Sequence, residues 1–197
     1  MDRAGLRRKL LKAQAEAGDI VLLFGDESEA LTHPYLAHVW AKRGTDLRIP
    51  APGQSAKVAM LGVLDWAGRE LIVRTSRTKR SADFIALLEE VDRRSGPKLG
   101  VAIQPLVLVL DNGPIHTSKA SRAALAERAH WLTVEWLPKS APELNDIEAV
   151  WRDLKRHHLA HQPPSGPEDL DQAIHDAVRK LNTERSRHSS ANRQMAA

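Results

Sequence analysis

Apolar residues are spaced along the chain in two ways, and together they predict alternating strands and helices. Apolar side chains that recur every three or four positions indicate amphipathic helices, whereas short unbroken apolar runs indicate buried strands. Helices are predicted at residues 2–17, 81–94, 117–130, 145–159 and 168–182. Strands are predicted at residues 20–24, 58–64, 71–75, 105–110 and 132–137, with a short further strand at 38–41.

The order of these elements indicates one α/β domain. Residues 65–70 join two strands as a glycine-containing hairpin turn, and the later strands alternate with helices. The run at 105–110 is the most apolar in the chain, so we expect it in the centre of a sheet that is covered on both faces. Residues 31–55 are rich in proline and glycine and predict a loop. The expected fold is a mixed central sheet of about five strands flanked by helices.

Composition limits the class of protein and of site. The chain has 197 residues, 42% of them hydrophobic and 27% charged, which is enough for one domain with a substantial core. No apolar run approaches the roughly 18 to 20 residues of a membrane span, and the basic N-terminus has no apolar signal core. We therefore expect a cytoplasmic protein without membrane contact. The chain has no cysteine, so any metal must be held by oxygen or imidazole groups.

The small positive charge of the chain is concentrated in its C-terminal tail. The formal net charge is +4, and residues 178–197 account for all of it. The tail has five basic residues against one acidic residue: Arg179, Lys180, Arg185, Arg187 and Arg193 against Glu184. Such a tail is either a solvated, frayed C-terminus or a DNA-binding arm, and composition does not choose between them.

Two aspartates come directly after predicted strands, where open α/β sheets place their functional groups. Asp26 comes after the run at residues 20–24, and Asp111 after the run at 105–110. If these strands are parallel neighbours, their ends lie about 5 Å apart, close enough for two carboxylates to share a metal ion. A structural explanation is equally available, because Asp111 precedes a turn sequence, Asn112-Gly113, and Asp26 would cap the segment after it.

Glu148 lies near the start of a predicted helix and also has two interpretations. Its spacing from Asn145 matches a capping box, in which the helix N-cap and the residue three positions later satisfy each other's backbone amides. Arg152 and Lys155 lie further along on nearly the same face. The three side chains are then either a surface ion-pair row or a metal ligand with phosphate-binding neighbours. The buried face of this helix is predicted to consist of Ile147, Val150, Trp151 and Leu154.

Three motifs around these acids resemble one family. They are FGDES at residues 24–28, LDNGPIH at 110–116 and LPKSAPELNDIE at 137–148, followed by Trp151 and Leu154-Lys155. Together they resemble the catalytic domain of the DDE transposases of the mariner superfamily, in its bacterial insertion-sequence branch. The resemblance covers residues 20–159, with 36 residues between the second and third acids. Three motifs in this order are a more specific signal than any one of them.

The resemblance implies a ribonuclease H-like fold, in which the first and fourth strands are adjacent and a later helix supplies the third acid. The residues that match the catalytic and metal-binding triad are Asp26, Asp111 and Glu148. The residues that match accompanying positions, expected as neighbours of the site, are Glu27, Asn112 and His116. Glu143 and Asp146 compete for the third position, but Glu148 is the last acid of its motif.

The implied activity is metal-dependent DNA cleavage and strand transfer, as in DNA transposition and integration. Carboxylate oxygens suit Mg²⁺ or Mn²⁺, and two ions about 4 Å apart would activate the attacking oxygen and stabilise the leaving one. Lys139, Arg152 and Lys155 are candidates for DNA phosphate contacts, with surface solvation as the alternative for each. Trp40, in a motif that also resembles the family, is expected to pack rather than to stack on bases, and Trp151 is expected in the core.

Two departures from the family pattern change these expectations. Asp146 replaces a common proline, and its charge either favours the helix dipole or crowds the metal site. Only 19 residues precede the first predicted strand, too few for the paired helix-turn-helix modules of the relatives. The chain alone is therefore expected to lack sequence-specific DNA binding. Recognition of transposon ends would need an upstream helix-turn-helix region, encoded in a separate reading frame if the element is split.

The expected organisation has three parts. Residues 1–18 form an N-terminal helix and linker, 19–162 the catalytic domain, and 163–197 a C-terminal helix with a basic tail. The active form is expected to be a homodimer, by resemblance. Two other classes of protein stay open. A non-catalytic remnant or accessory DNA-binding protein would keep this fold, and a phosphatase or phosphoacceptor domain would also use a strand-end aspartate, although it has no need of the motif at 137–148.

Overall fold

The computed structural model describes residues 3–50, 53–139 and 141–194, with side chains to residue 187. The strands are β1 (Val21–Leu31), β2 (Lys57–Asp65), β3 (Glu70–Ser76), β4 (Leu106–Leu110) and β5 (Leu132–Trp136). The helices are α1 (Arg3–Glu16), α2 (Ser81–Ser95), α3 (Pro114–Thr117), α4 (Lys119–Glu127), α5 (Ile147–Asp153) and α6 (Pro167–Gln194). A 3₁₀ turn, η1 (Pro142–Leu144), precedes α5, and a π-helical turn, η2 (Leu154–His158), comes after it.

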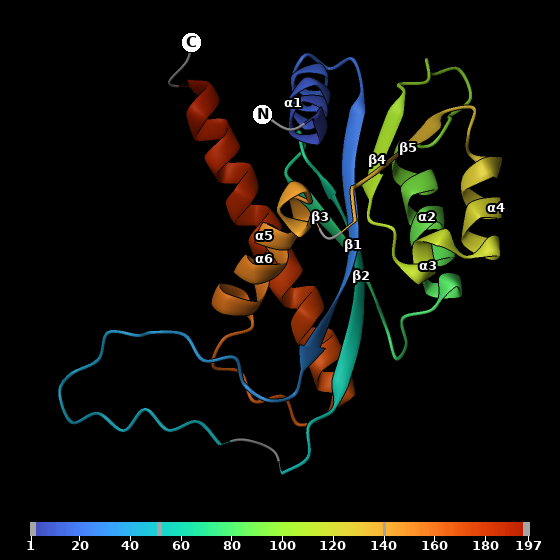
Figure 1. The fold of residues 1–197 in the computed structure, drawn as a ribbon. Coiled ribbons are helices and arrows are strands. Elements are labelled where there is room, and N and C mark those ends of the chain that lie inside the picture. Colours follow the sequence, from blue (N-terminus) through green and yellow to red (C-terminus); the bar gives the residue numbers. More distant parts are fainter. Residues whose placement is uncertain (1–2, 51–52, 140, 195–197) are drawn as a thin grey trace.

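The strands form one mixed sheet of five strands in the order β3-β2-β1-β4-β5 (Figure 1). β2 pairs antiparallel with both β1 and β3, whereas β4 pairs parallel with both β1 and β5. The predicted hairpin, the mixed sheet and the adjacency of the first and fourth strands are therefore confirmed. All five residues of β4 are buried, as expected for a central strand covered on both faces.

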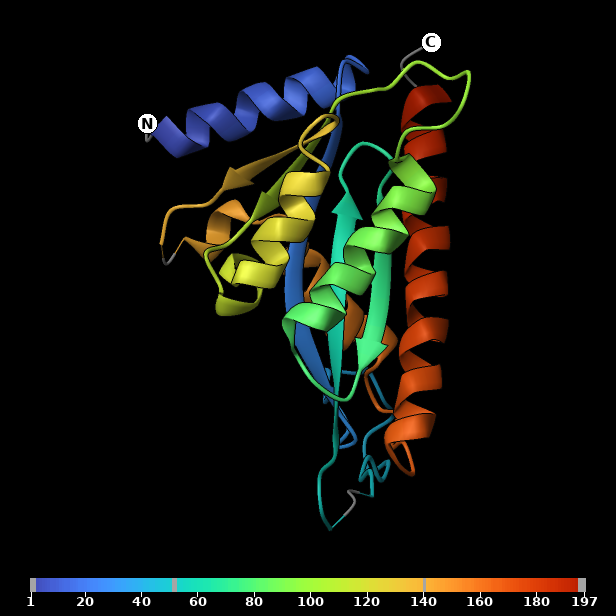
Figure 2. The same cartoon turned by 90° about the vertical axis from the view of Figure 1, so that its right-hand side faces the viewer.

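Helices cover both faces of the sheet (Figure 2). On one face, α1, α5 and α6 contribute to an apolar cluster that includes Phe24 and Trp151. On the other face, α2 and α4 pack around a second cluster that includes Leu23 and Phe84. Phe24 and Leu23 belong to different clusters because successive side chains of a strand point to opposite faces of the sheet.

Helix α5 approaches the sheet closely at Gly62 of β2. A Cβ atom at Gly62 would lie only 2.6 Å from the Trp151 ring, so the missing side chain makes room for that ring. Gly62 is also the partner of Asp26 in the register of β1 with β2. The Trp151 ring therefore holds α5 against the strand pair that carries the first predicted acid. Trp151 is 2% exposed, which confirms its predicted place in the core.

Four predicted elements differ from the observed ones. The helix predicted at 145–159 is α5, which begins at Ile147, ends at Asp153 and is followed by the π-helical turn η2. β1 continues through polar residues to Leu31 because β2 pairs with it as far as that residue, so Asp26 lies inside a strand and not at its end. The helix predicted at 117–130 is two short helices, because Ser118 ends α3 and its side chain caps α4. The last helix is longer than predicted and reaches Gln194.

The segment between β1 and β2 is a long extended loop that leaves the body of the protein (Figure 1). The strand predicted at 38–41 is not formed, and Trp40 is fully exposed, so its predicted packing is also wrong. Most of the basic tail lies in α6 and is helical, while residues 195–197 and Asp2 lie outside the described residues. Among the described helices, none is long and apolar enough to cross a membrane.

Candidate active site

Strands β1 and β4 bring the first two predicted acids together. Their parallel register pairs Phe24 with Val109, and Asp26 and Asp111 each lie two residues further along. β4 ends one residue before Asp111, whereas β1 continues past Asp26 along β2. Adjacent strands lie about 4.8 Å apart, so the backbone positions of the two acids are close neighbours at this edge of the sheet.

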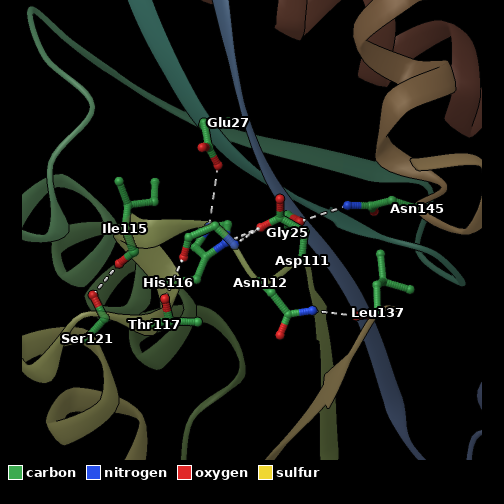
Figure 3. Close-up of polar contacts among 11 residues, drawn as sticks. Gly25, Glu27, Asp111, Asn112, Ile115, His116, Thr117, Ser121, Leu137 and Asn145 are labelled. Atoms are coloured by element: carbon green, nitrogen blue, oxygen red, sulfur yellow. Dashed lines mark hydrogen bonds and ion pairs between the residues drawn. The ribbon is translucent and has the colours of Figure 1, made fainter. Parts of the chain in front are cut away.

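Asp111 is held by the loop that it begins (Figure 3). Its Oδ1 atom accepts a hydrogen bond from the Gly113 amide at 2.9 Å and lies 2.7 Å from Nδ1 of His116. The hydrogen bond with His116 is the main reason why the pKa of Asp111 is lowered. Asp111 is therefore a carboxylate at neutral pH, and its orientation is set by the imidazole.

His116 links Asp111 to Glu27 of β1 (Figure 3). Its buried ring packs edge-on against Phe84 with 4.7 Å between ring centroids, and its Nε2 lies 3.5 Å from Oε2 of Glu27. Glu27, Asp111 and His116 each offer a ligand atom within 4.8 Å of the others, a spacing suited to a metal ion. Strand alternation explains the arrangement, because Glu27 and Asp26 point to opposite faces and Asp111 lies at the strand end between them.

The third predicted acid, Glu148, lies in the first turn of α5, and the capping box predicted for it is wrong. The N-cap residue is Asp146, and no side chain caps the helix. Asn145 is buried, and its Nδ2 instead donates to the Gly25 carbonyl at 3.1 Å. Asn145 thus ties the start of α5 to β1 beside Asp26 (Figure 3). The capping explanation for Glu148 is thereby removed.

The three predicted acids line one cavity of about 350 Å³. The remaining lining residues come mainly from the loop after β4 and from the segment that leads into α5, and they include Asn112 and Lys139. Asn112 also joins these two segments, since its Nδ2 donates to the Leu137 carbonyl at 2.6 Å. Arg152 is exposed and does not line the cavity. A larger cavity of about 590 Å³ between α4 and β5 is lined by no acidic residue.

Asp26 lies in the most strongly perturbed electrostatic environment of the site. Burial raises the pKa of Asp26 to about 7, and repulsion from Glu148, Glu27 and Asp111 contributes to the increase. Lys155 of η2 is a cation close to β1, because its Nζ donates a hydrogen bond to Oγ of Ser28 at 2.7 Å. Burial lowers the pKa of Lys155, opposed chiefly by the attraction of Glu148.

The donor set fits a hard divalent cation. The acids that line the cavity offer carboxylate oxygens, which Mg²⁺ and Mn²⁺ prefer. Burial is the main cause of the raised pKa of Asp26, and a bound cation would relieve the further part that comes from repulsion by the neighbouring acids. The acids near Asp111 do not all line the cavity, however. Asp26 and Glu148 line the cavity with Asp111, whereas Glu27 and His116 do not line it. His116 contacts Asp111, and Glu27 contacts His116.

Asp146 does not crowd this site, contrary to one of the two predictions made for it. Its carboxylate pairs with Arg8 and Lys12 of α1, and the Lys12 Nζ lies 2.6 Å from Oδ2. The sequence does not predict that Asp146 pairs with Arg8 or that Asn145 bonds to Gly25, because the two residues of each pair lie more than 100 positions apart along the chain. The only signal for them was the position of both residues inside the third motif.

Comparison with known proteins agrees with this arrangement. Residues 21–171 match the family model described as DDE superfamily endonuclease. The insertion element IS630 uncharacterized 39 kDa protein of Shigella sonnei is 26% identical over 136 residues, which is 68% of this chain and 37% of that protein. The aligned part thus spans little more than a third of that relative.

Solved structures share the fold at low sequence identity. The Mos1 mariner paired end complex with Mn aligns with a TM-score of 0.54 and 18% identity, covering 93% of this chain and 60% of that chain. A chain of the simian T-cell lymphotropic virus intasome aligns with a TM-score of 0.56 and 16% identity, covering 80% and 46%. These likenesses confirm the predicted ribonuclease H-like fold.

Proposed function

The chain belongs to the DDE superfamily endonucleases, and from this premise we propose that residues 19–162 form the catalytic domain of an insertion-sequence transposase. The proposed reaction is hydrolysis of a DNA phosphodiester at the transposon end, followed by attack of the released 3′-hydroxyl on target DNA. One observation carries the proposal. Acids from three separate elements, β1, the loop after β4 and α5, line a single cavity.

Asp26, Asp111 and Glu148 are the proposed catalytic residues and the proposed ligands of Mg²⁺ or Mn²⁺, with two ions in the active state. When bound, the metal supplies activation of the attacking oxygen and neutralisation of charge on the leaving one. The protein's own contribution is to hold these ligands. His116 and the Gly113 amide orient Asp111, while Asn145 holds the helix that carries Glu148 close to β1.

Three cations are proposed to contact DNA phosphates. Lys139 lines the cavity, and Lys155 donates a hydrogen bond to Ser28 on β1. These positions support the proposal that both contact a phosphate that enters the site. Arg152 is exposed one helical turn after Glu148, a position suited to the flanking backbone of the DNA. Loss of any one of them is expected to weaken binding to all DNA sequences alike.

Transposon ends and target DNA are the proposed partners. We assign recognition of the transposon ends to a helix-turn-helix region upstream of α1, encoded in the same reading frame or a separate one. Helix α6 is proposed to be a C-terminal extension of the catalytic domain.

The proposed active form is a homodimer. In support, four apolar side chains on the loop between β1 and β2 are exposed: Leu36, Val39, Trp40 and Leu47. Trp40→Ser should then lower the molar mass measured in solution.

Metal-dependent nicking tests the proposed reaction. The chain, joined to its upstream frame, is incubated with Mg²⁺ or Mn²⁺ and DNA that carries the element's ends. Asp26→Asn, Asp111→Asn and Glu148→Gln are each expected to reduce nicking by about 10³-fold. Glu143→Gln is the matched control, because Glu143 is an exposed acid of the same motif that does not line the cavity. Unchanged nicking in all three variants would disprove the catalytic assignment.

The same measurements distinguish the alternative function. A non-catalytic remnant would bind Mn²⁺ and DNA but leave DNA intact under every condition that supports binding. Mn²⁺ binding that depends on Asp26, Asp111 and Glu148, without any nicking, would therefore favour the remnant.

A further inference from the structure

Helix α1 lies outside the residues that match the family model, yet it reaches the segment that carries the third acid. Arg8 and Lys12 are one helical turn apart and both pair with Asp146, Arg8 with Oδ1 and Lys12 with Oδ2. All three side chains are largely shielded from water, at 30%, 22% and 18% exposure respectively. Lys12 also lies over the Trp66 ring, 5.0 Å from its centroid. The pairing is thus a partly buried cluster of three charges.

Asp146 lies at the start of the helix that carries Glu148. It is the N-cap residue of α5, two residues before Glu148, and its side chain makes no capping hydrogen bond to its own helix. Its neighbour Asn145 is tied to β1 through the Gly25 carbonyl. The short segment that leads into α5 is therefore held on one side by the sheet and on the other by α1.

Helix α1 is itself firmly anchored, so it is able to act as a support. Leu11 and Ala15 are buried in the same apolar cluster as Trp151 of α5. A further ion pair joins Arg7 to Glu135 of β5 at 3.1 Å. That pair belongs to the same helix but touches neither Asp146 nor α5.

We propose that α1 is a positioning element of the candidate active site, in which Arg8 and Lys12 hold Asp146 and thereby set the place of Glu148. The proposal rests on the proposed function, since it assigns a support for the same metal-binding acids. Its physical basis is the free-energy cost of leaving a partly buried carboxylate without a cationic partner. Without the two cations, Asp146 is an uncompensated, partly buried carboxylate at the start of α5, and it gains free energy by turning toward water. The first turn of α5, with Glu148, moves with it.

The first test measures the local order of α5 by amide hydrogen exchange in the whole metal-free chain. In Arg8→Gln/Lys12→Gln, amides of residues 145–150 should exchange faster than in the wild type. Arg7→Gln, which breaks the ion pair to β5, should leave them unchanged. Asp146→Asn introduced into the double variant removes the uncompensated charge and should restore slow exchange. Unchanged exchange at residues 145–150 in the double variant would overturn the proposal.

The second test measures Mn²⁺ affinity from the paramagnetic resonance signal of the free ion. The double variant is expected to bind Mn²⁺ about tenfold more weakly, as is usual when groups that orient metal ligands are lost. Asp146→Asn in that background should recover most of the affinity. Weak binding that Asp146→Asn fails to restore would mean a general loss of packing and would also overturn the proposal. If the wild type bound no Mn²⁺ while the exchange results held, the proposed function would fail and the positioning role of α1 would stand.

Discussion

Replacing Asp26 by asparagine is expected to stabilise the metal-free protein at alkaline pH. Burial and the repulsion of Glu148, Glu27 and Asp111 raise the pKa of Asp26 to about 7 from an ordinary value of 3.8. Between these pH values the folded chain binds more protons at Asp26 than the unfolded chain does. The free energy of unfolding therefore falls as the pH rises through this range, and the loss is complete above pH 7.

The size of the loss is set by the same difference in pKa. A difference of about 3 pH units corresponds to about 4 kcal/mol, at about 1.4 kcal/mol per unit. This is an upper limit, because the neighbouring carboxylates share the proton and adjust to its loss. We expect Asp26→Asn to gain about 1 to 3 kcal/mol relative to the wild type at pH 8, and almost nothing at pH 4. Asparagine has nearly the same shape as aspartate, so packing is preserved.

Urea unfolding of both proteins at pH 4 and pH 8, in the presence of EDTA, measures this difference. Asp111→Asn is the matched control with the opposite sign, because the hydrogen bond from His116 lowers the pKa of Asp111. Its carboxylate stabilises the folded state above the unfolded pKa, so its loss should destabilise the protein at pH 8. Adding Mn²⁺ at pH 8 should stabilise the wild type but not Asp26→Asn. An equal stability difference between wild type and Asp26→Asn at both pH values would refute the reasoning.

Three further predictions concern the residues that hold the site. Gly62→Val should cost about 1 to 3 kcal/mol in the free energy of unfolding, because a Cβ there lies 2.6 Å from the Trp151 ring. Gly53→Val, at a position with open space, is the control, and equal stability of the two would contradict the packing argument. Asn145→Ala should lose about 1 to 2 kcal/mol with the hydrogen bond to Gly25, measured by urea unfolding, and an unchanged midpoint would count against that bond. His116→Gln should weaken Mn²⁺ binding about 10- to 100-fold in calorimetry, since it orients Asp111, and wild-type affinity would exclude that role.

The elements of the sheet were largely predictable because local apolar patterns reflect burial. The runs that became β2, β3, β4 and β5 were located to within one or two residues, and the buried face of α5 was predicted correctly. β1 was truncated in the prediction because its second half is polar. That half is a strand because β2 pairs with it, and a pairing partner leaves no mark on the polar side chains themselves.

The chain order of the acids was also available from the sequence, but their arrangement was not. Asp26, Asp111 and Glu148 could be chosen from their motifs, and all three line one cavity. Strand alternation then separates Asp26 from Glu27, and Glu27 is joined to Asp111 only through His116. This division depends on the register of β1 with β4, which no single motif contains.

Local rules and tertiary contacts disagreed most clearly at the start of α5. The spacing of Asn145 and Glu148 satisfies the rule for a capping box, yet Asn145 is bonded to Gly25 and Asp146 to α1. The physical reason is competition for hydrogen-bonding groups. A buried strand carbonyl and two cations, brought near by the fold, are partners that the isolated segment does not have. The sequence by itself indicated most of the elements, the family and the candidate acids, whereas the tertiary structure decided which groups hold Asp111 and the start of α5 in place.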